Sequence, residues 1–181
     1  IGTVVGGTTW SIEGMPDWMQ FAADLVERPE VLHEEARRRS EAAIAKFDEL
    51  AEAGPDFIHL VNDIAFNAGP FIAPDLIREL VLPYLAAQVA HLRSLGIIPF
   101  IHTDGNIMSF LDDYIATGAA CYQSVDPQAG MDIAEVKRRC EGKLALMGNV
   151  QCSLLQDGPR EAIRESTLYC LTHGSPGGGY I

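Results

Sequence analysis

A histidine and an aspartate stand together at the end of an apolar run near the middle of the chain. Residues 100–106 read FIHTDGN, and the preceding GIIPFI has the composition of a strand buried on both faces. His102 and Asp104 are two residues apart, and alternate residues of a strand share one face, so both could hold one ligand or metal ion. Imidazole nitrogen and carboxylate oxygen are zinc ligands. We therefore predict a catalytic or metal site at His102 and Asp104, against the alternative that His102 is a satisfied core histidine.

Other apolar runs also end in polar side chains. These candidates are Asn62 and Asp63 after the run at 57–63, Asn106 in the FIHTDGN loop, Asp126 after the run at 120–126 and Asn149 after the run at 143–149. We predict a catalytic or ligand role for Asp63 and substrate-binding roles for the other four. Each has a structural alternative: Asp63 as an acceptor of loop N–H groups, Asp126 as a turn residue before Pro127, and Asn149 as a backbone cap. Cys152 is expected to be a small thiol without a chemical role.

The elements that must position these side chains alternate between short apolar runs and helical patterns. Strands are expected at 3–7, 57–63, 97–104, 120–126, 143–149 and 178–181. Helices are expected at about 18–26, 31–53, 75–95, 108–117, 133–140 and 160–171, and Pro83 should kink or split the third. This order is typical of βα units and a parallel sheet.

Fold class is therefore α/β, and we predict a (β/α)8 TIM-type barrel in which about the first two βα units are missing. A doubly wound open sheet is the competing architecture. The chain has no G-x-G-x-x-G after a strand and no GK[ST] motif, so it lacks the motifs with which open α/β sheets bind nucleotides. Residues 1–181 are expected to form one barrel domain, truncated at both ends.

Composition excludes several classes of partner. A net charge of −12 argues against nucleic acid, and the cluster Arg37–Arg39 lies among glutamates, as on a solvated helix face. No apolar stretch approaches the ~20 residues of a membrane helix, and the first residues do not resemble a signal peptide. Four cysteines without a C-x-x-C pair indicate a reduced, cytoplasmic protein.

The motifs at the strand ends resemble the uroporphyrinogen decarboxylase superfamily. The matching segments, in the order found in that family, are NDIAFNAGPFIAPDLIRELVLPYL, FIHTDGNIMSFLDDYIATGA, SVDPQAGMDIAEVKRR, LALMGNV and GGGYI. The resemblance implies a (β/α)8 barrel enzyme. One branch of the superfamily decarboxylates uroporphyrinogen to coproporphyrinogen without a cofactor, using an arginine-rich segment that would precede Ile1. The other moves methyl groups between corrinoid proteins and thiols, with zinc on a His-x-Cys pair and a later cysteine, which would fall beyond Ile181.

The resemblance favours the methyltransferase branch, because H-x-D-G-N is closer to its pattern. His102 then matches the family's histidine, and Asp104 stands where the family has its first cysteine. Asp63 and Asn149 would line a pocket for a methyl donor or thiol. Expected partners are a small-molecule or tetrapyrrole substrate and, for methyl transfer, a corrinoid protein; a homodimer is compatible with the resemblance. The alternatives are decarboxylation in tetrapyrrole biosynthesis, and an inactive fragment or half of a swapped dimer.

Overall fold

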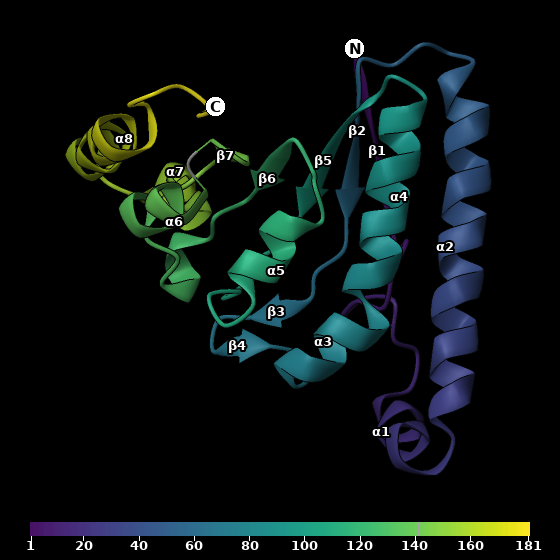
Figure 1. Ribbon diagram of the computed structural model, residues 1–181. Helices are drawn as coiled ribbons and strands as arrows, with labels where there is room; N and C mark the ends of the chain where they lie inside the picture. The colour runs from purple at the N-terminus through teal and green to yellow at the C-terminus, as the bar shows by residue number, and fades with distance from the viewer. Residues whose placement is uncertain (141) are drawn as a thin grey trace.

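A parallel sheet of five strands forms the centre of the computed structural model, which describes residues 1–140 and 142–181 (Figure 1). The strands are β1 (Gly2–Gly6), β2 (Phe57–Val61), β5 (Ile98–His102), β6 (Cys121–Gln123) and β7 (Ala145–Met147). Each pairs in parallel with the next in the order β1-β2-β5-β6-β7. The strands predicted before residue 178 are confirmed, most of them slightly shorter than their apolar runs.

Strand order distinguishes the two architectures that the sequence allows. A doubly wound sheet reverses its order at a switch point, whereas the strands of a (β/α)8 barrel follow one another around the sheet. Here spatial order equals chain order throughout the sheet. The barrel-type arrangement is therefore confirmed, and the five strands form a continuous sector of it.

Helices follow the strands as βα units require. They are α1 (Trp18–Glu27), α2 (Pro29–Ala51), α3 (Pro74–Leu80), α4 (Leu82–Ser94), α5 (Leu111–Ala116), α6 (Ile133–Cys140), α7 (Cys152–Asp157) and α8 (Arg160–Gly174). Helices α2 and α4 run side by side (Figure 1). The helix predicted at 75–95 is split into α3 and α4 just before Pro83, whose ring nitrogen cannot donate an intrahelical hydrogen bond.

Four features differ from the sequence-based prediction. Strands β3 (Ala65–Phe66) and β4 (Gly69–Pro70) form a hairpin after β2, and α7 and a 3-10 turn, η1 (Pro127–Ala129), were not expected. A strand at 178–181 is wrong: only Tyr180 pairs, through an isolated parallel bridge to Leu146. The reason is the left-handed backbone of Gly178 and Gly179 (φ +79° and +67°), which is incompatible with an extended strand.

The outward side of the sheet makes the core beneath the helices. Alternate strand residues supply it, each at most 1% exposed: Ile58, Leu60, Ile101, Tyr122 and Leu146. Burial of each such side chain is worth about 1.5–3 kcal/mol. The other face of the sheet carries His59, Phe100 and His102. On this face the rings of Phe57 and Phe100 stack, with centroids 4.7 Å apart. His102 thus belongs to the face that lines the interior of a barrel.

No helix in the described part of the chain is both long enough and apolar enough to span a membrane.

Candidate metal centre

The carboxyl ends of β2 and β5 bring Asp63, His102 and Asp104 together. Residues Val61 and His102 are register partners, so the segments that follow the two strands begin side by side. Nε2 of His102 lies 3.2 Å from Oδ1 of Asp63 and 3.9 Å from Oδ1 of Asp104. One donor atom from each residue fits within 4.8 Å of the other two. Sites of (β/α)8 enzymes lie at this end of the sheet.

Gln123 fixes the orientation of the His102 ring. It is the last residue of β6 and the register partner of His102, and its Oε1 accepts a hydrogen bond from Nδ1. With the proton on Nδ1, the lone pair of Nε2 in the neutral ring points toward Asp63 and Asp104. An acceptor on the far nitrogen is the usual support of a metal-binding histidine.

Charge and burial shift the pKa values of the pair Asp63 and His102 in opposite directions. The hydrogen bond from His102 holds the pKa of Asp63 well below its usual range, aided by the backbone N–H of Asp104 at 2.8 Å. Burial lowers the pKa of His102, but the hydrogen bond and charge of Asp63 and the charge of Asp104 outweigh it and raise the pKa. In the absence of a metal ion, the site therefore favours an imidazolium–carboxylate pair.

Asp104 is the most solvent-exposed residue of the cluster. Its side chain is 59% exposed, against 22% for Asp63 and 13% for His102. Ser124 donates its hydroxyl to the Oδ1 of Asp104, so the β6 end supports this carboxylate as well as the histidine. A group entering from solvent meets Asp104 first.

Close backbone contacts hold the turn after His102. Gly105 has a φ of +83°, and a Cβ at this position would lie 2.3 Å from the carbonyl oxygen of Ala65 in the β3–β4 hairpin. The backbone N–H of Asn106 also donates a hydrogen bond to the hairpin, to the carbonyl oxygen of Phe66 at 2.9 Å. Glycine is required here, since only a residue without a side chain allows both the left-handed turn and the approach of the hairpin.

Two predicted substrate-binding residues, Asn62 and Asn106, have side chains occupied by the protein itself. Asn62 is 5% exposed, and its Oδ1 accepts from the backbone N–H groups of Thr8 (2.8 Å) and Thr9 (3.2 Å). The side chain of Asn106 bonds to Ala129 O and Met108 N at 2.9 and 3.0 Å. Both residues hold loops around the site.

Asp126 and Asn149 lie near the cluster and also bond to the backbone. Asp126 accepts from Gln128 N at 2.9 Å, capping η1, and from Gly105 N at 3.4 Å. Asn149, which is 7% exposed, donates to the carbonyls of Val125 and Met131. These bonds match the turn and capping alternatives that the sequence left open for them.

A cavity of about 280 Å³ opens beside the cluster, between the ends of β5, β6 and β7. Its lining residues are His102, Asp104, Gln123, Ser124, Asp126, Pro127, Gln128, Gly148, Val150 and Cys152. No lysine or arginine is among these described lining residues. The free thiol of Cys152 is exposed here, whereas Cys121 is buried and burial raises the pKa of its thiol to about 12.

The sequence prediction missed two members of the site, Gln123 and Ser124. Gln123 had a usable signal, since alternation within ACYQSVD places it on the same face as Cys121. Ser124 had none, because the same alternation places it on the opposite face. The three predicted catalytic residues, by contrast, do lie together.

The donor set fits a divalent metal. One imidazole nitrogen and two carboxylate oxygens are ligands of catalytic zinc, which keeps a fourth position for water or substrate. Gln123 supplies the expected hydrogen bond behind the histidine, and the cavity provides access from the open side.

Comparison with known proteins places the chain in a family. The family model "Uroporphyrinogen decarboxylase (URO-D)" matches residues 4–181. Uroporphyrinogen decarboxylase of Coxiella burnetii is 26% identical over 185 residues, covering 97% of this chain and 49% of the relative. The corresponding enzyme of Xanthomonas euvesicatoria pv. vesicatoria is 25% identical over 183 residues, covering 96% and 49%. The chain thus spans about half the length of the curated relatives it matches.

A solved structure supports the fold. A methyltransferase from Methanosarcina mazei superposes with a TM-score of 0.72 at 23% identity, covering 86% of this chain and 44% of the other. At that identity the likeness shows the fold alone. The family match over residues 4–181 shows that this chain belongs to the uroporphyrinogen decarboxylase family.

Proposed function

We propose that this chain carries the metal centre of a methyl-transferring enzyme of the family, in which a divalent metal, zinc in the first instance, activates a thiol that accepts a methyl group from a corrinoid protein. The observation that carries the proposal is the convergence of Asp63, His102 and Asp104 within 4.8 Å beside an open cavity. A bound zinc ion would act as a Lewis acid that lowers the pKa of the thiol, so that it attacks as thiolate.

The protein groups have separate tasks in this proposal. His102 and the two aspartates hold the metal, and Gln123 keeps the Nε2 of His102 directed at it. Ser124 steadies Asp104, the carboxylate nearest solvent. Asn62 and Asn149 act indirectly, because their amide groups hold the loops that surround the site.

Asp104 distinguishes this centre from a thiolate-rich one. A carboxylate oxygen is a harder ligand than sulfur and leaves the site richer in oxygen donors. A divalent metal held by these residues would be a stronger Lewis acid toward an entering sulfur than one with an additional thiolate ligand, because carboxylate oxygens donate less electron density.

Decarboxylation of uroporphyrinogen is the second candidate, supported by the curated relatives, which are named uroporphyrinogen decarboxylases. In that case the same carboxylates would face the pyrrole rings, with an acid protonating or stabilising the ring as carboxylate is lost. A polycarboxylate substrate calls for cationic partners. The cavity lining contains Asp104 and Asp126 but neither lysine nor arginine among the described residues, and the arginine-rich segment that the resemblance implies for this branch would precede Ile1.

One assay separates the two candidates. Purified protein is incubated with zinc, methylcobalamin and a small thiol, and in parallel with uroporphyrinogen. We expect loss of the methylcobalamin spectrum with wild type and with His173→Ala, a histidine on α8, but not with His102→Ala. Formation of coproporphyrinogen without demethylation would overturn the proposal in favour of decarboxylation.

A further inference from the structure

A second cavity, of about 220 Å³, lies where helix α1 and the β1–α1 loop, residues 7–17, meet the beginning of α2. Helix α1 lies beside the lower end of α2 in Figure 1. The described lining residues of this cavity differ throughout from those of the cavity beside the metal centre. Its apolar walls come from all three segments: Trp10 and Met15 of the loop, Phe21 of α1, and Val31 and Leu32 of α2.

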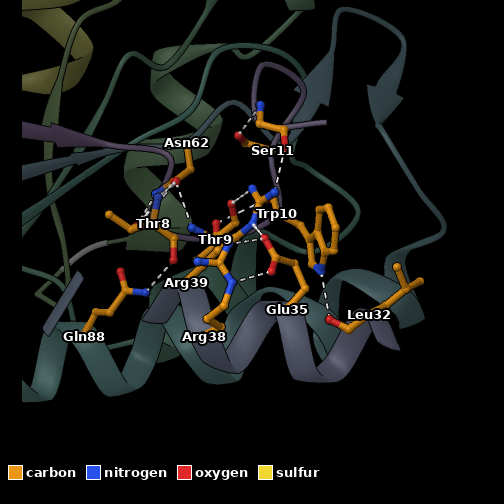
Figure 2. Close-up of polar contacts among 11 residues, drawn as sticks. Thr8, Thr9, Trp10, Ser11, Leu32, Glu35, Arg38, Arg39, Asn62 and Gln88 are labelled. Carbon is orange, nitrogen blue, oxygen red and sulfur yellow. Dashed lines mark hydrogen bonds and ion pairs between the residues drawn. The ribbon is translucent and has the colours of Figure 1, made fainter. Parts of the chain in front are cut away.

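Trp10 forms a fixed wall of this cavity. Its Nε1 donates to the carbonyl oxygen of Leu32 at 3.1 Å, as Figure 2 shows, and its ring meets that of Phe21 edge-on with centroids 5.0 Å apart. The guanidinium carbon of Arg39 lies 4.3 Å from the centroid of the Trp10 ring. Trp10 and Phe21 are both buried. The indole ring is therefore held in one orientation by the protein alone.

Arg39 of α2 also fastens the loop that carries Trp10. Its Nη2 donates to Gly14 O at 2.8 Å, and its Nε donates to Glu35 at 2.8 Å. The Arg39 side chain is only 15% exposed, so the predicted solvated helix face is wrong for this arginine, although Arg37 and Arg38 are exposed as predicted. The cavity is thus preformed, and a ligand would not have to order its walls.

Asp24 is the buried polar group of the cavity. Its side chain is 8% exposed, and carboxylates are seldom buried unless they are paired. Gln20 Nε2 (2.9 Å), Arg28 Nε (3.0 Å) and Arg28 Nη2 (2.6 Å) all donate to the same oxygen, Oδ1. No described hydrogen bond ends at Oδ2. A carboxylate offers about four acceptor sites, so Oδ2 keeps its capacity for a donor in the cavity.

The other charged groups of the lining are acidic and already have partners. Glu35 accepts from Arg38 and Arg39 through both of its oxygens. Asp17, at the exposed rim, caps α1 by accepting two backbone N–H groups. Lysine, arginine and histidine are absent from the described lining residues. The cavity therefore combines apolar walls with one buried carboxylate oxygen that lacks a donor.

We propose that this cavity binds a small organic amine, with its apolar part against Trp10 and Phe21 and its ammonium group on Oδ2 of Asp24. The inference is independent of the metal centre. The volume lies below the roughly 300–1,000 Å³ of pockets for drug-sized ligands, so a single ring with a short chain suits it. An ammonium group makes a charge-assisted hydrogen bond to a carboxylate, which is stronger than the bond of a neutral donor.

The test uses phenethylamine as the probe and the fluorescence of Trp10 as the readout. The chain has two tryptophans, so the parent protein for all titrations is Trp18→Phe, in which Trp10 is the only one. We expect a saturable change with phenethylamine. Phenethyl alcohol and phenylacetate, which lack the ammonium group, should bind about 10-fold or more weakly.

Variants of α1 locate the ammonium group. Asp24→Asn, made in the parent protein, should weaken phenethylamine binding by about 10-fold or more. Glu27→Gln is the matched control, because Glu27 is an exposed carboxylate of the same helix that does not line the cavity, and it should bind as the parent does.

The proposal would be overturned by the absence of a saturable change, by equal affinity for all the probes, or by unchanged affinity in Asp24→Asn. Should Asp24→Asn not fold, the probe series on the parent protein still decides whether the ammonium group is required. Val31→Phe, at a half-exposed position of the lining, then decides where the probe binds. The added ring should fill the cavity and abolish the fluorescence change, and unchanged binding would contradict the proposal.

Discussion

His102 and Asp63 face each other across the ends of two neighbouring strands, with Nε2 and Oδ1 3.2 Å apart. They lie 39 positions apart in the chain, and the parallel register of β2 and β5 brings them together. The pKa of the His102 imidazole is raised and that of the Asp63 carboxyl is lowered, as is common at functional sites. The contact lies at the carboxyl end of the sheet, where (β/α)8 enzymes have their active sites.

Gln123 should be needed for metal affinity rather than for folding. Gln123→Leu removes the acceptor of His102 Nδ1, so the ring loses the bond that directs Nε2 to the aspartates. We expect zinc affinity to fall by about 10–100-fold, measured by chelator competition, with little change in Tm. The matched control is Gln151→Leu, a partly buried position whose side chain bonds only to Ser153 among its described contacts. Equal affinity in both variants would contradict the orienting role.

Gly105 should tolerate a methyl group far less well than Gly96. Both have left-handed φ values, +83° and +76°, but only the Cβ at 105 would meet the backbone of Ala65. We expect Gly96→Ala to lower the free energy of unfolding by about 1–2 kcal/mol and Gly105→Ala by about 3 kcal/mol or more. Urea denaturation of the metal-free proteins measures both. Similar losses in the two variants would show that the hairpin yields to the added methyl.

The anchoring of the β1–α1 loop should weaken in acid. The hydrogen bonds and charges of Arg38 and Arg39, the hydrogen bond from Arg38 first, together lower the pKa of Glu35 to about 2, although burial acts to raise it. A depressed folded-state pKa stabilises the protein above the ordinary value of 4.5, and this contribution is lost as the pH falls from 4.5 toward 2. Wild type should therefore exceed Glu35→Gln in stability at pH 6, and the difference should shrink below pH 4.5. A pH-independent difference in urea denaturation would contradict this.

Cys152 should react first with thiol reagents. It is the exposed cysteine of the four, whereas Cys121, Cys140 and Cys170 are buried. Burial also raises the pKa of the Cys121 and Cys140 thiols to about 12 and 11, so little thiolate is present near neutral pH. Folded protein should consume one equivalent of a disulfide reagent quickly, and Cys152→Ser should abolish that phase. A fast phase that survives in Cys152→Ser would place an accessible thiol elsewhere.

The predictable part of the fold rested on patterns that are local in the sequence. Apolar runs with helical segments between them defined the βα units, and Pro83 marked the break between α3 and α4. Because parallel strands deliver their carboxyl ends to one edge, the residues after the runs could be expected to meet. Asp63, His102 and Asp104 satisfy that expectation.

The remaining features depend on contacts between distant segments. Nothing in the sequence near Asn62 indicates that Thr8 occupies its amide group, or that Arg39 is drawn out of a solvated triplet by Trp10 and Gly14. The β3–β4 hairpin has strands of two residues, too short for a periodic signal. The tail at Gly178 shows the opposite case, in which an apparent strand is interrupted by left-handed glycines.

The measurement that tests the central claim most directly is the metal content of the purified protein, by elemental analysis, for wild type, His102→Ala and the matched control His173→Ala. We predict about one divalent ion per chain, zinc in the first instance, in wild type and His173→Ala, and a loss of it in His102→Ala with the fold retained by circular dichroism. Fully folded wild type that remains metal-free after incubation with zinc would contradict the account.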